Sequence, residues 1–343
     1  MKHFPVMLVI SPSESKVRST KGPARSFATA LVSTALVTAL TIVSGAGAQP
    51  FPPPSDPETA KMMRRLSALS ADSMEGRRAG SPGAARARKW IIGELNAIGV
   101  KPAGSAFESS VALRPRAGST DTVGANVAAR IPGTKGSGPV IVLSAHYDHL
   151  GVRNGETFNG ADDDASGCVA LLTIAERLVK QPPKHDVILA FFDAEESGMV
   201  GSKAFAAAPP VPLERIGLNI NLDMVARQDA GALWVAGVSH TAALKPIAEA
   251  AAKSAAVSIR FGHDTKDLKP GDDWTNSSDH ASFHAKGIPF FYLGVEDHPD
   301  YHKPGDDADK IDPKFYRGTT DFAYALLRQA DKALEQIAAM RRK

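Results

Sequence analysis

The feature that most constrains the fold is a series of uninterrupted apolar runs, each of which ends in a polar cluster. Residues 140–145 and Val187–Phe192 contain no charged side chain and no apolar-polar alternation. Such runs are typical of strands that are buried on both faces. Helix-periodic segments separate them, and strands that alternate with helices indicate an α/β fold. The sequence therefore predicts a sheet covered by helices on both faces.

The same patterns extend along most of the chain. We expect further strands over residues 107–113, 125–131, 218–222, 233–236 and 288–293. Helical spacing predicts helices over residues 58–69, 84–98, 166–178, 198–208, 241–255 and 314–340. These segments predict a single domain over residues 58–343, with no internal repeat.

The N-terminal segment has the pattern of a secretory signal. Basic residues precede an uncharged stretch over 26–44, and Ala46-Gly47-Ala48 resembles a cleavage site. We expect a signal peptide over 1–48 and a proline-rich tether over 49–57, which predicts an exported protein, periplasmic or secreted. A membrane anchor is the alternative, but Ser and Thr dilute the apolar stretch and no basic stop-transfer cluster follows it.

Charge and cysteine content exclude several functions. The formal net charge is +3, but residues 1–48 supply +4 and the remainder carries −1. This balance gives no electrostatic case for binding nucleic acid or an anionic membrane. After residue 48 no stretch reaches the ~18 apolar residues of a spanning helix, so stable membrane insertion is not expected after cleavage. Cys168 is the single cysteine, and its small, apolar neighbours predict a buried structural thiol rather than a nucleophile.

Polar clusters follow the predicted strands at their carboxyl ends, where ligand sites of α/β sheets lie. Taken alone, a Glu-Glu pair is usually a solvated turn, and a single histidine is usually a surface or core residue. Several carboxylates on one rim would repel one another and raise each other's pKa values. A pair of divalent cations would remove that repulsion, so the sequence predicts a metal site at this rim.

The order of these clusters resembles the M28 family of zinc aminopeptidases. The motifs are His146-x-Asp148, the segment 160–167, Glu195-Glu196, Asp223 and Tyr301-His302, and the resemblance runs from about Arg78 to the C-terminal helix. It implies a three-layer α/β/α sandwich with a central mixed, mostly parallel sheet. It also implies two Zn²⁺ ions, with Mn²⁺ or Co²⁺ as possible replacements.

The resemblance implies a role for each motif residue. The implied metal ligands are His146, Asp163, Glu196, Asp223 and His302. Asp163 would bridge both ions, whereas its neighbours Asp162 and Asp164 would bind neither, and the peptide bond between Asp163 and Asp164 is expected to be cis. His298 lies close to His302 in the sequence, but the pattern Tyr-His followed by Asp306 favours His302 as the ligand.

Three further residues are implied in catalysis. Glu195 would be the general base, which takes a proton from a zinc-bridging water and returns it to the leaving amine. Asp148 would orient the imidazole of His146. Tyr301 is a candidate stabiliser of the oxyanion, with core packing as the alternative.

The remaining family features concern the surroundings of the site. His149 and His280 also match family positions, and we interpret residues 278–283 as structural or pocket-lining. Only the 62 residues 84–145 lie between Gly83 and His146, too few for the protease-associated domain that the family often carries. We therefore expect loops 151–158 and 262–276 to control access of the substrate.

The predicted function is metal-dependent removal of N-terminal residues from peptides. A carboxypeptidase or a glutaminyl cyclase on the same scaffold is the first alternative. Similar cyclases use one metal, whereas Asp163 and both ligand histidines favour two. The second alternative is a non-catalytic binding protein, which would have lost ligands or base; all five ligands and Glu195 are present here.

Overall fold

The computed structural model describes residues 51–113, 123–265, 267–269 and 271–342. The predicted signal peptide and the first two residues of the tether lie outside these ranges. Residues 49–343 belong to one compact unit. No helix within the described ranges is both long enough and apolar enough to cross a membrane.

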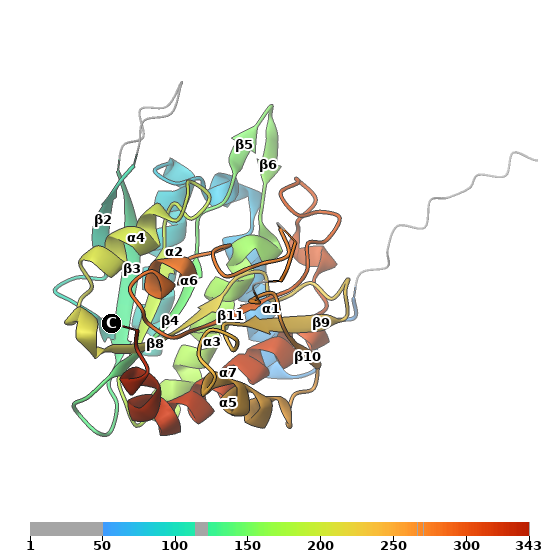
Figure 1. Cartoon of the computed structure of the whole chain (residues 1–343). Helices are drawn as coiled ribbons and strands as arrows, with labels where there is room; N and C mark the ends of the chain where they lie inside the picture. Colours follow the sequence, from blue (N-terminus) through green and yellow to red (C-terminus); the bar gives the residue numbers. More distant parts are fainter. Residues whose placement is uncertain (1–50, 114–122, 266, 270, 343) are drawn as a thin grey trace, which may run out of the picture. The chain divides into compact units, whose positions relative to one another are not determined.

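A central mixed sheet forms the middle layer (Figure 1). In the described residues its strand order is β1–β3–β7–β4–β8–β11–β9–β10, and β2 pairs with β3. The strands are β1 (Lys101–Pro102), β2 (Glu108–Ala112), β3 (Val123–Ile131), β4 (Val140–His146), β7 (Val187–Phe192), β8 (Ile216–Leu222), β9 (Ala232–Ala236), β10 (Ser258–Phe261) and β11 (Phe290–Gly294). The neighbours β7, β4, β8 and β11 are parallel, so their carboxyl ends lie along one edge.

Helices cover the two faces of this sheet unequally. One face packs against α1 (Pro57–Leu69), α2 (Pro82–Ile98), α3 (Gly167–Lys180), α5 (Leu244–Ala252) and α7 (Pro313–Ala339). The opposite face packs against the shorter α4 (Val200–Ala207) and α6 (His280–His284). This arrangement confirms the predicted α/β/α sandwich with a mostly parallel centre.

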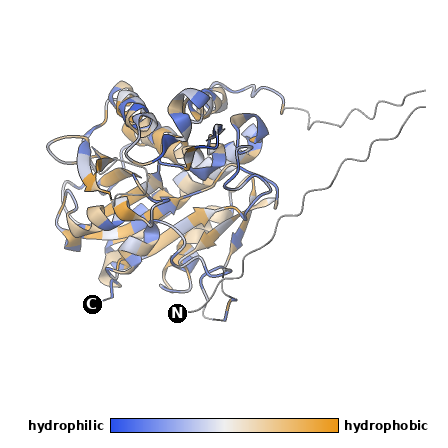
Figure 2. Ribbon diagram, turned by 90° about the horizontal axis from the view of Figure 1, so that it is seen from above, coloured by the Kyte–Doolittle hydropathy of each residue, from blue (hydrophilic) through white to orange (hydrophobic). Residues whose placement is uncertain are grey.

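Burial on both faces explains the uninterrupted apolar runs. In β4, Ile141 and Leu143 pack into the larger core, whereas Val140 and Val142 pack into the smaller one. Figure 2 shows the hydrophobic colour along the strands of the sheet. Because successive side chains of a strand point to opposite faces, a strand between two helical layers needs apolar residues at every position.

Three helices begin one or two residues earlier than the apolar spacing predicts. Each starts with a proline that follows a capping side chain: Asp56 accepts from Thr59 N at 2.8 Å, Ser81 from Ala84 N at 3.2 Å, and Asp312 from Lys314 N at 2.9 Å. Proline is well tolerated at the first helical position because the N–H it lacks has no intrahelical partner there.

The shortest elements were not predicted. They are β1, β10, α6 and a two-stranded hairpin of β5 (Gly151–Arg153) and β6 (Glu156–Phe158), which occupies the predicted loop 151–158. The strands among them have four residues or fewer, and the five residues of α6 make less than two helical turns. Segments of these lengths are too short for a hydrophobic period to be distinct.

Candidate metal centre

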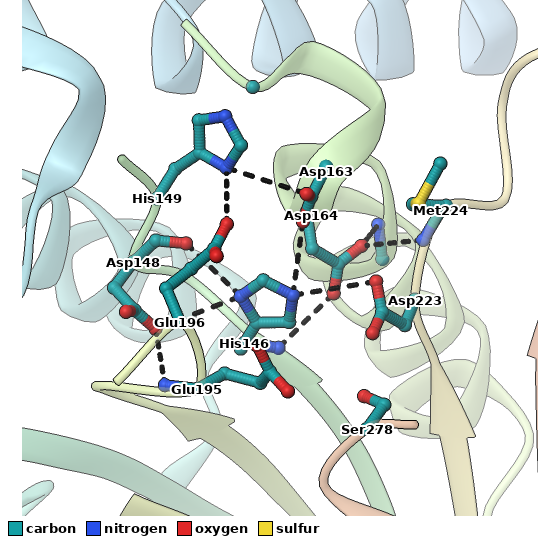
Figure 3. Close-up of polar contacts among 12 residues, drawn as sticks. His146, Asp148, His149, Asp163, Asp164, Glu195, Glu196, Asp223, Met224 and Ser278 are labelled. Carbon is teal, nitrogen blue, oxygen red and sulfur yellow. Dashed lines mark hydrogen bonds and ion pairs between the residues drawn. The ribbon is translucent and has the colours of Figure 1, made fainter. Parts of the chain in front are cut away.

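The predicted site residues meet at the edge where the four parallel strands end. Figure 3 shows six of them, namely His146, Asp148, Asp163, Glu195, Glu196 and Asp223. His146 is the last residue of β4, Asp223 follows β8, and Glu195 and Glu196 follow β7. A cavity of about 400 Å³ opens here, and all five residues predicted as ligands line it together with Glu195 and Tyr301.

The first cluster consists of His146, Asp163 and Asp223, which are all buried. His146 Nε2 lies 3.2 Å from Asp163 Oδ1 and 3.4 Å from Asp223 Oδ1. Two ligands of one tetrahedral ion, with bonds of about 2.0–2.1 Å, are about 3.3 Å apart. The spacing of this cluster therefore fits three ligands around one ion.

The second cluster uses the other oxygen of Asp163. His302 Nε2 lies 3.1 Å from Asp163 Oδ2 and 3.3 Å from Glu196 Oε1. His149 Nδ1 approaches the same pair, at 2.9 Å from Glu196 Oε1 and 3.6 Å from Asp163 Oδ2. Asp163 thus offers one carboxylate oxygen to each cluster, as a bridging ligand would.

The charge of the second cluster favours a cation. Burial lowers the pKa of His302, but the hydrogen bonds to Asp163 and Glu196 outweigh this effect and raise it to about 10. The carboxylates therefore draw a positive charge into the space between them. A divalent ion would supply that charge, and the imidazoles would then bind it as neutral ligands.

Three successive aspartates at this edge have different contacts. Asp162 Oδ1 accepts from Ala226 N at 2.7 Å. Asp164 accepts from His146 N at 3.1 Å and from Gly167 N at 2.9 Å. Their carboxylates thus hold backbone amides, while Asp163 faces both clusters. The peptide bond between Asp163 and Asp164 is cis, as the resemblance implies.

Arg77 supports the turn that carries Asp163. This arginine is fully buried. Its guanidinium donates to the backbone carbonyls of five residues, namely Tyr147 (2.7 Å), Leu69 (3.1 Å), Gly160 (2.8 Å), Asp163 (3.4 Å) and Asn159. It therefore connects the end of β4 to the turn before Asp163, and sequence reasoning did not single it out.

We expect Arg77→Met to lower the free energy of unfolding by about 3 kcal/mol or more, because each hydrogen bond from a charged donor contributes about 1.5–3 kcal/mol and buried carbonyls would lose their partner. Denaturant titration measures the change. Arg64→Met is the matched control, since Arg64 is exposed on α1 and should change stability by less than about 0.5 kcal/mol. Equal values for the two variants would contradict the role given to Arg77.

Glu195 lies beside both clusters and lines the cavity. Burial raises its pKa well above the usual range, and nearby Asp279 and Asp223 add to this effect. A carboxylate that binds protons more readily is suited to accept one from a substrate or water. Its backbone N donates to Asp148 Oδ1 at 2.9 Å, which fixes the residue at the end of β7.

Asp148 contacts His146 through both its backbone and its side chain. The carboxylate Oδ1 of Asp148 lies 3.7 Å from His146 Nδ1, whereas the backbone carbonyl of Asp148 lies at 3.1 Å. The closer contact to the imidazole is therefore made by the carbonyl. The Asp148 carboxylate instead receives the hydrogen bond from Glu195 N, so Asp148 contacts both the first cluster and the expected base.

The structure separates the roles of His298, His302 and Tyr301, which lie close together near the C-terminal end of the site. His302 reaches the second cluster, whereas His298 Nε2 lies 3.4 Å from Asp162 Oδ2, outside both clusters. Tyr301 lines the cavity, and its ring stacks on His302 with centroids 4.0 Å apart. Burial raises the pKa of Tyr301, so its hydroxyl remains protonated and able to donate.

Asp193 follows β7 at this edge, and its ionisation should make the stability of the fold depend on pH. It is buried, Oδ2 accepts from Ala125 N at 2.9 Å, and burial together with Asp148 raises its pKa from 3.8 to about 6. The unfolded chain releases this proton near pH 4, but the folded chain keeps it until about pH 6. Raising the pH across this window therefore destabilises the wild-type fold.

Asp193→Asn removes this proton equilibrium. Relative to the wild type, the free energy of unfolding of the variant should rise by roughly 2 kcal/mol from pH 4 to pH 7. This is less than 1.36 kcal/mol per pKa unit gives over the whole transition, because an unfolded aspartate is already more than half ionised at pH 4. Denaturant titrations of both proteins at the two pH values measure the difference. The exposed Asp309→Asn should show no such gain. A constant difference between Asp193→Asn and wild type would contradict the raised pKa.

The outer wall of the cavity contains aromatic side chains that the sequence did not single out. His263 and Trp274 stack with ring centroids 3.8 Å apart and an interplanar angle of 6°. Both line the cavity and belong to the predicted insertion 262–276. Among the described residues, none of the hairpin Gly151–Phe158 lines it. His280, in the segment interpreted as structural or pocket-lining, is buried and stacks on Phe290.

Comparisons with known proteins agree with this architecture. Aminopeptidase YwaD of Bacillus subtilis is 29% identical over 202 residues, which cover 56% of this chain and 41% of that relative. The structure of BSAP, a zinc aminopeptidase from Bacillus subtilis, superposes with a TM-score of 0.64 at 16% identity, over 79% of this chain and 95% of that one. Porphyromonas gingivalis glutaminyl cyclase superposes with a TM-score of 0.63 at 19% identity, over 78% and 97%.

These structural similarities establish a shared fold, which an aminopeptidase and a cyclase have in common. The sequence match is more specific, because the model of "Peptidase family M28" matches residues 126–327. That range includes the turn that carries Asp163, both glutamates and Tyr301-His302. The chain therefore belongs to peptidase family M28.

Proposed function

We propose that this protein is a two-zinc aminopeptidase. The observation that carries the proposal is the pair of imidazole-carboxylate clusters that share Asp163 beside Glu195. One ion would be held by His146, Asp163 and Asp223, and the other by Asp163, Glu196 and His302. Nitrogen and carboxylate ligands in these numbers suit zinc, and the BSAP structure is that of a zinc enzyme.

The residues of the chain have defined tasks in peptide hydrolysis. When bound, the two ions would lower the pKa of a coordinated water and polarise the scissile carbonyl. Glu195 would accept a proton from the attacking water and deliver it to the nitrogen of the leaving group. The protonated hydroxyl of Tyr301 would donate to the oxygen of the tetrahedral intermediate. Asp148 would hold the backbone of Glu195 and the imidazole of His146 in position.

The charge around the cavity favours recognition of a free amine. Asp272, Glu296 and Asp297 line the cavity in addition to the cluster residues. Among the described residues, no lysine or arginine lines it. A carboxypeptidase has to neutralise the terminal carboxylate of its substrate, whereas this acidic wall attracts an ammonium group. The lining therefore supports an aminopeptidase over the carboxypeptidase alternative.

We also propose that the protein is exported. The support is the sequence of residues 1–48, with basic residues, an uncharged stretch and an Ala-Gly-Ala site before Gln49. Cleavage there would release a chain that starts with the tether and α1. Mass spectrometry of the protein from periplasmic or culture fractions tests this, and an intact N-terminus on cytoplasmic protein would contradict it.

A substrate panel tests the proposed activity. Aminoacyl anilides, their N-acetylated forms, peptides with free or amidated C-termini and an N-terminal glutaminyl peptide would be assayed with and without a chelator. We expect hydrolysis only of substrates with a free amine, loss of activity with chelator, and recovery with Zn²⁺. Cleavage of blocked but not free-amine peptides, or cyclisation of the glutaminyl peptide without hydrolysis, would overturn the proposal.

A further inference from the structure

His149 is a buried imidazole at the second cluster with no role assigned by the ligand set above. It lies three residues after His146, and its side chain has no exposed surface. Figure 3 shows the ring directed toward the carboxylates of Glu196 and Asp163. An imidazole in this position is desolvated, so its nitrogens need a partner of some kind.

The contacts of His149 differ from those of an ordinary ion pair. Nδ1 lies 2.9 Å from Glu196 Oε1 and 3.6 Å from Asp163 Oδ2. Two ligands of one zinc ion, with bonds of about 2.0–2.1 Å, are about 2.9 Å apart at a right angle and about 3.5 Å apart at 120°. Among the described residues, neither ring nitrogen has a hydrogen-bond partner at both a suitable distance and a suitable angle. A nitrogen that is close to two carboxylates without a hydrogen bond to either is placed as a ligand that shares an ion with them.

We propose that His149 is a protein ligand of the ion held by Asp163 and Glu196. This inference rests on the proposed two-ion centre. It makes the two sites unequal: the second would have four protein ligands, including the imidazoles of His149 and His302, whereas the first has three, including only that of His146. The second site would still admit a water as a fifth ligand, because catalytic zinc can become five-coordinate. The nitrogen-rich site is expected to retain zinc more strongly and to discriminate more strongly against Mn²⁺, which prefers oxygen ligands.

The backbone near His149 is built to hold the ring. Gly160 has a φ of +55°, and a Cβ there would lie 2.6 Å from the ring of His149 and 2.1 Å from Asp163 O. The same turn therefore carries Asp163 and leaves space for His149. By contrast, the side chain of His302 is 38% exposed, and its residue has a φ of +54° on the rim. His149 is thus the more enclosed of the two imidazoles.

Metal titration of the full chain tests the proposal. Apoprotein would be titrated with Zn²⁺ in competition with a chromophoric chelator, and with Co²⁺ while its visible absorption is recorded. The key variant is His149→Gln, which keeps a hydrogen-bond donor for Glu196 and a similar volume but is a poor zinc ligand. His149→Ala is the second variant. His284→Gln is the control, because His284 lies on α6 and contacts Arg342.

We expect His149→Gln and His149→Ala to weaken one of two zinc-binding steps by more than about 100-fold, beyond the about 10–100-fold loss when only a group that supports a ligand is removed. The Co²⁺ spectrum at one equivalent should change, and His284→Gln should match the wild type. Wild-type affinities and spectrum in folded His149→Gln would overturn the proposal. A wild-type chain that binds no ion would overturn the two-ion centre itself, which is a separate result.

Discussion

Glu195→Gln should lower kcat for peptide hydrolysis by about 10²–10⁴-fold, the usual contribution of a positioned general base. Glutamine has nearly the same shape as glutamate, but its amide cannot accept a proton at neutral pH. Glu195 lies beside both clusters, and burial raises the pKa of its carboxyl group, which suits proton transfer. Steady-state kinetics on a free-amine substrate give the loss, and elemental analysis should find as much zinc as in the wild type.

The control for this variant is Glu214→Gln. Glu214 is exposed and lies just before β8, at the opposite edge of the sheet from the site, so the same chemical change should leave kcat unaltered. If Glu195→Gln keeps its zinc and hydrolyses peptides at the wild-type rate, Glu195 is not the base. A loss of zinc together with activity would instead identify Glu195 as a support of the metal centre.

Asp163→Asn should remove both ions and abolish activity. Asp163 presents one oxygen to each cluster, 3.2 Å from His146 Nε2 and 3.1 Å from His302 Nε2. An asparagine has one acceptor oxygen and an amide nitrogen that cannot bind a metal, so it cannot bridge two ions. It also removes the negative charge that the two sites share. Metal content after gel filtration in chelator-treated buffer is the direct measurement.

Two further variants make this result specific. Asp223 belongs to the first cluster only, so Asp223→Asn should lose one ion and retain the other. Asp309 is exposed, and Asp309→Asn should keep both ions. If Asp163→Asn and Asp223→Asn retain the same amount of metal, Asp163 does not bridge. The pair therefore separates a shared ligand from a ligand of one ion.

Most of the fold could be predicted from local patterns, and the exceptions have physical causes. The buried strands β4 and β7 are apolar at every position because both of their faces are covered, and that pattern is visible in the sequence. The hairpin β5–β6 and helix α6 are too short for a period to emerge. Three helices start at Pro57, Pro82 and Pro313, earlier than the apolar spacing predicts. The capping residue and the proline are not part of the apolar face, so they add nothing to the helical period.

The sequence could also group the site residues but not define their contacts. Asp162, Asp163 and Asp164 are chemically identical neighbours, and only the turn decides which of them faces the clusters. His149 and His302 are 153 residues apart, yet both approach Glu196 Oε1. Arg77 reaches the carbonyl of Gly160 from the short 3₁₀ helix Asp72–Arg77 between α1 and α2. Such convergence depends on packing over the whole chain.

The sequence by itself determined the α/β class, the strand ends that carry the chemistry and the membership of a metallopeptidase family. It could do so because burial of each strand and the types of ligand are properties of local segments. Only the tertiary structure decided that Asp163 divides its oxygens between two clusters, that the Asp148 carbonyl lies closer than its carboxylate to His146, and that His149 joins the second cluster. These depend on distances of a few ångströms between segments far apart in the chain, which no local pattern encodes.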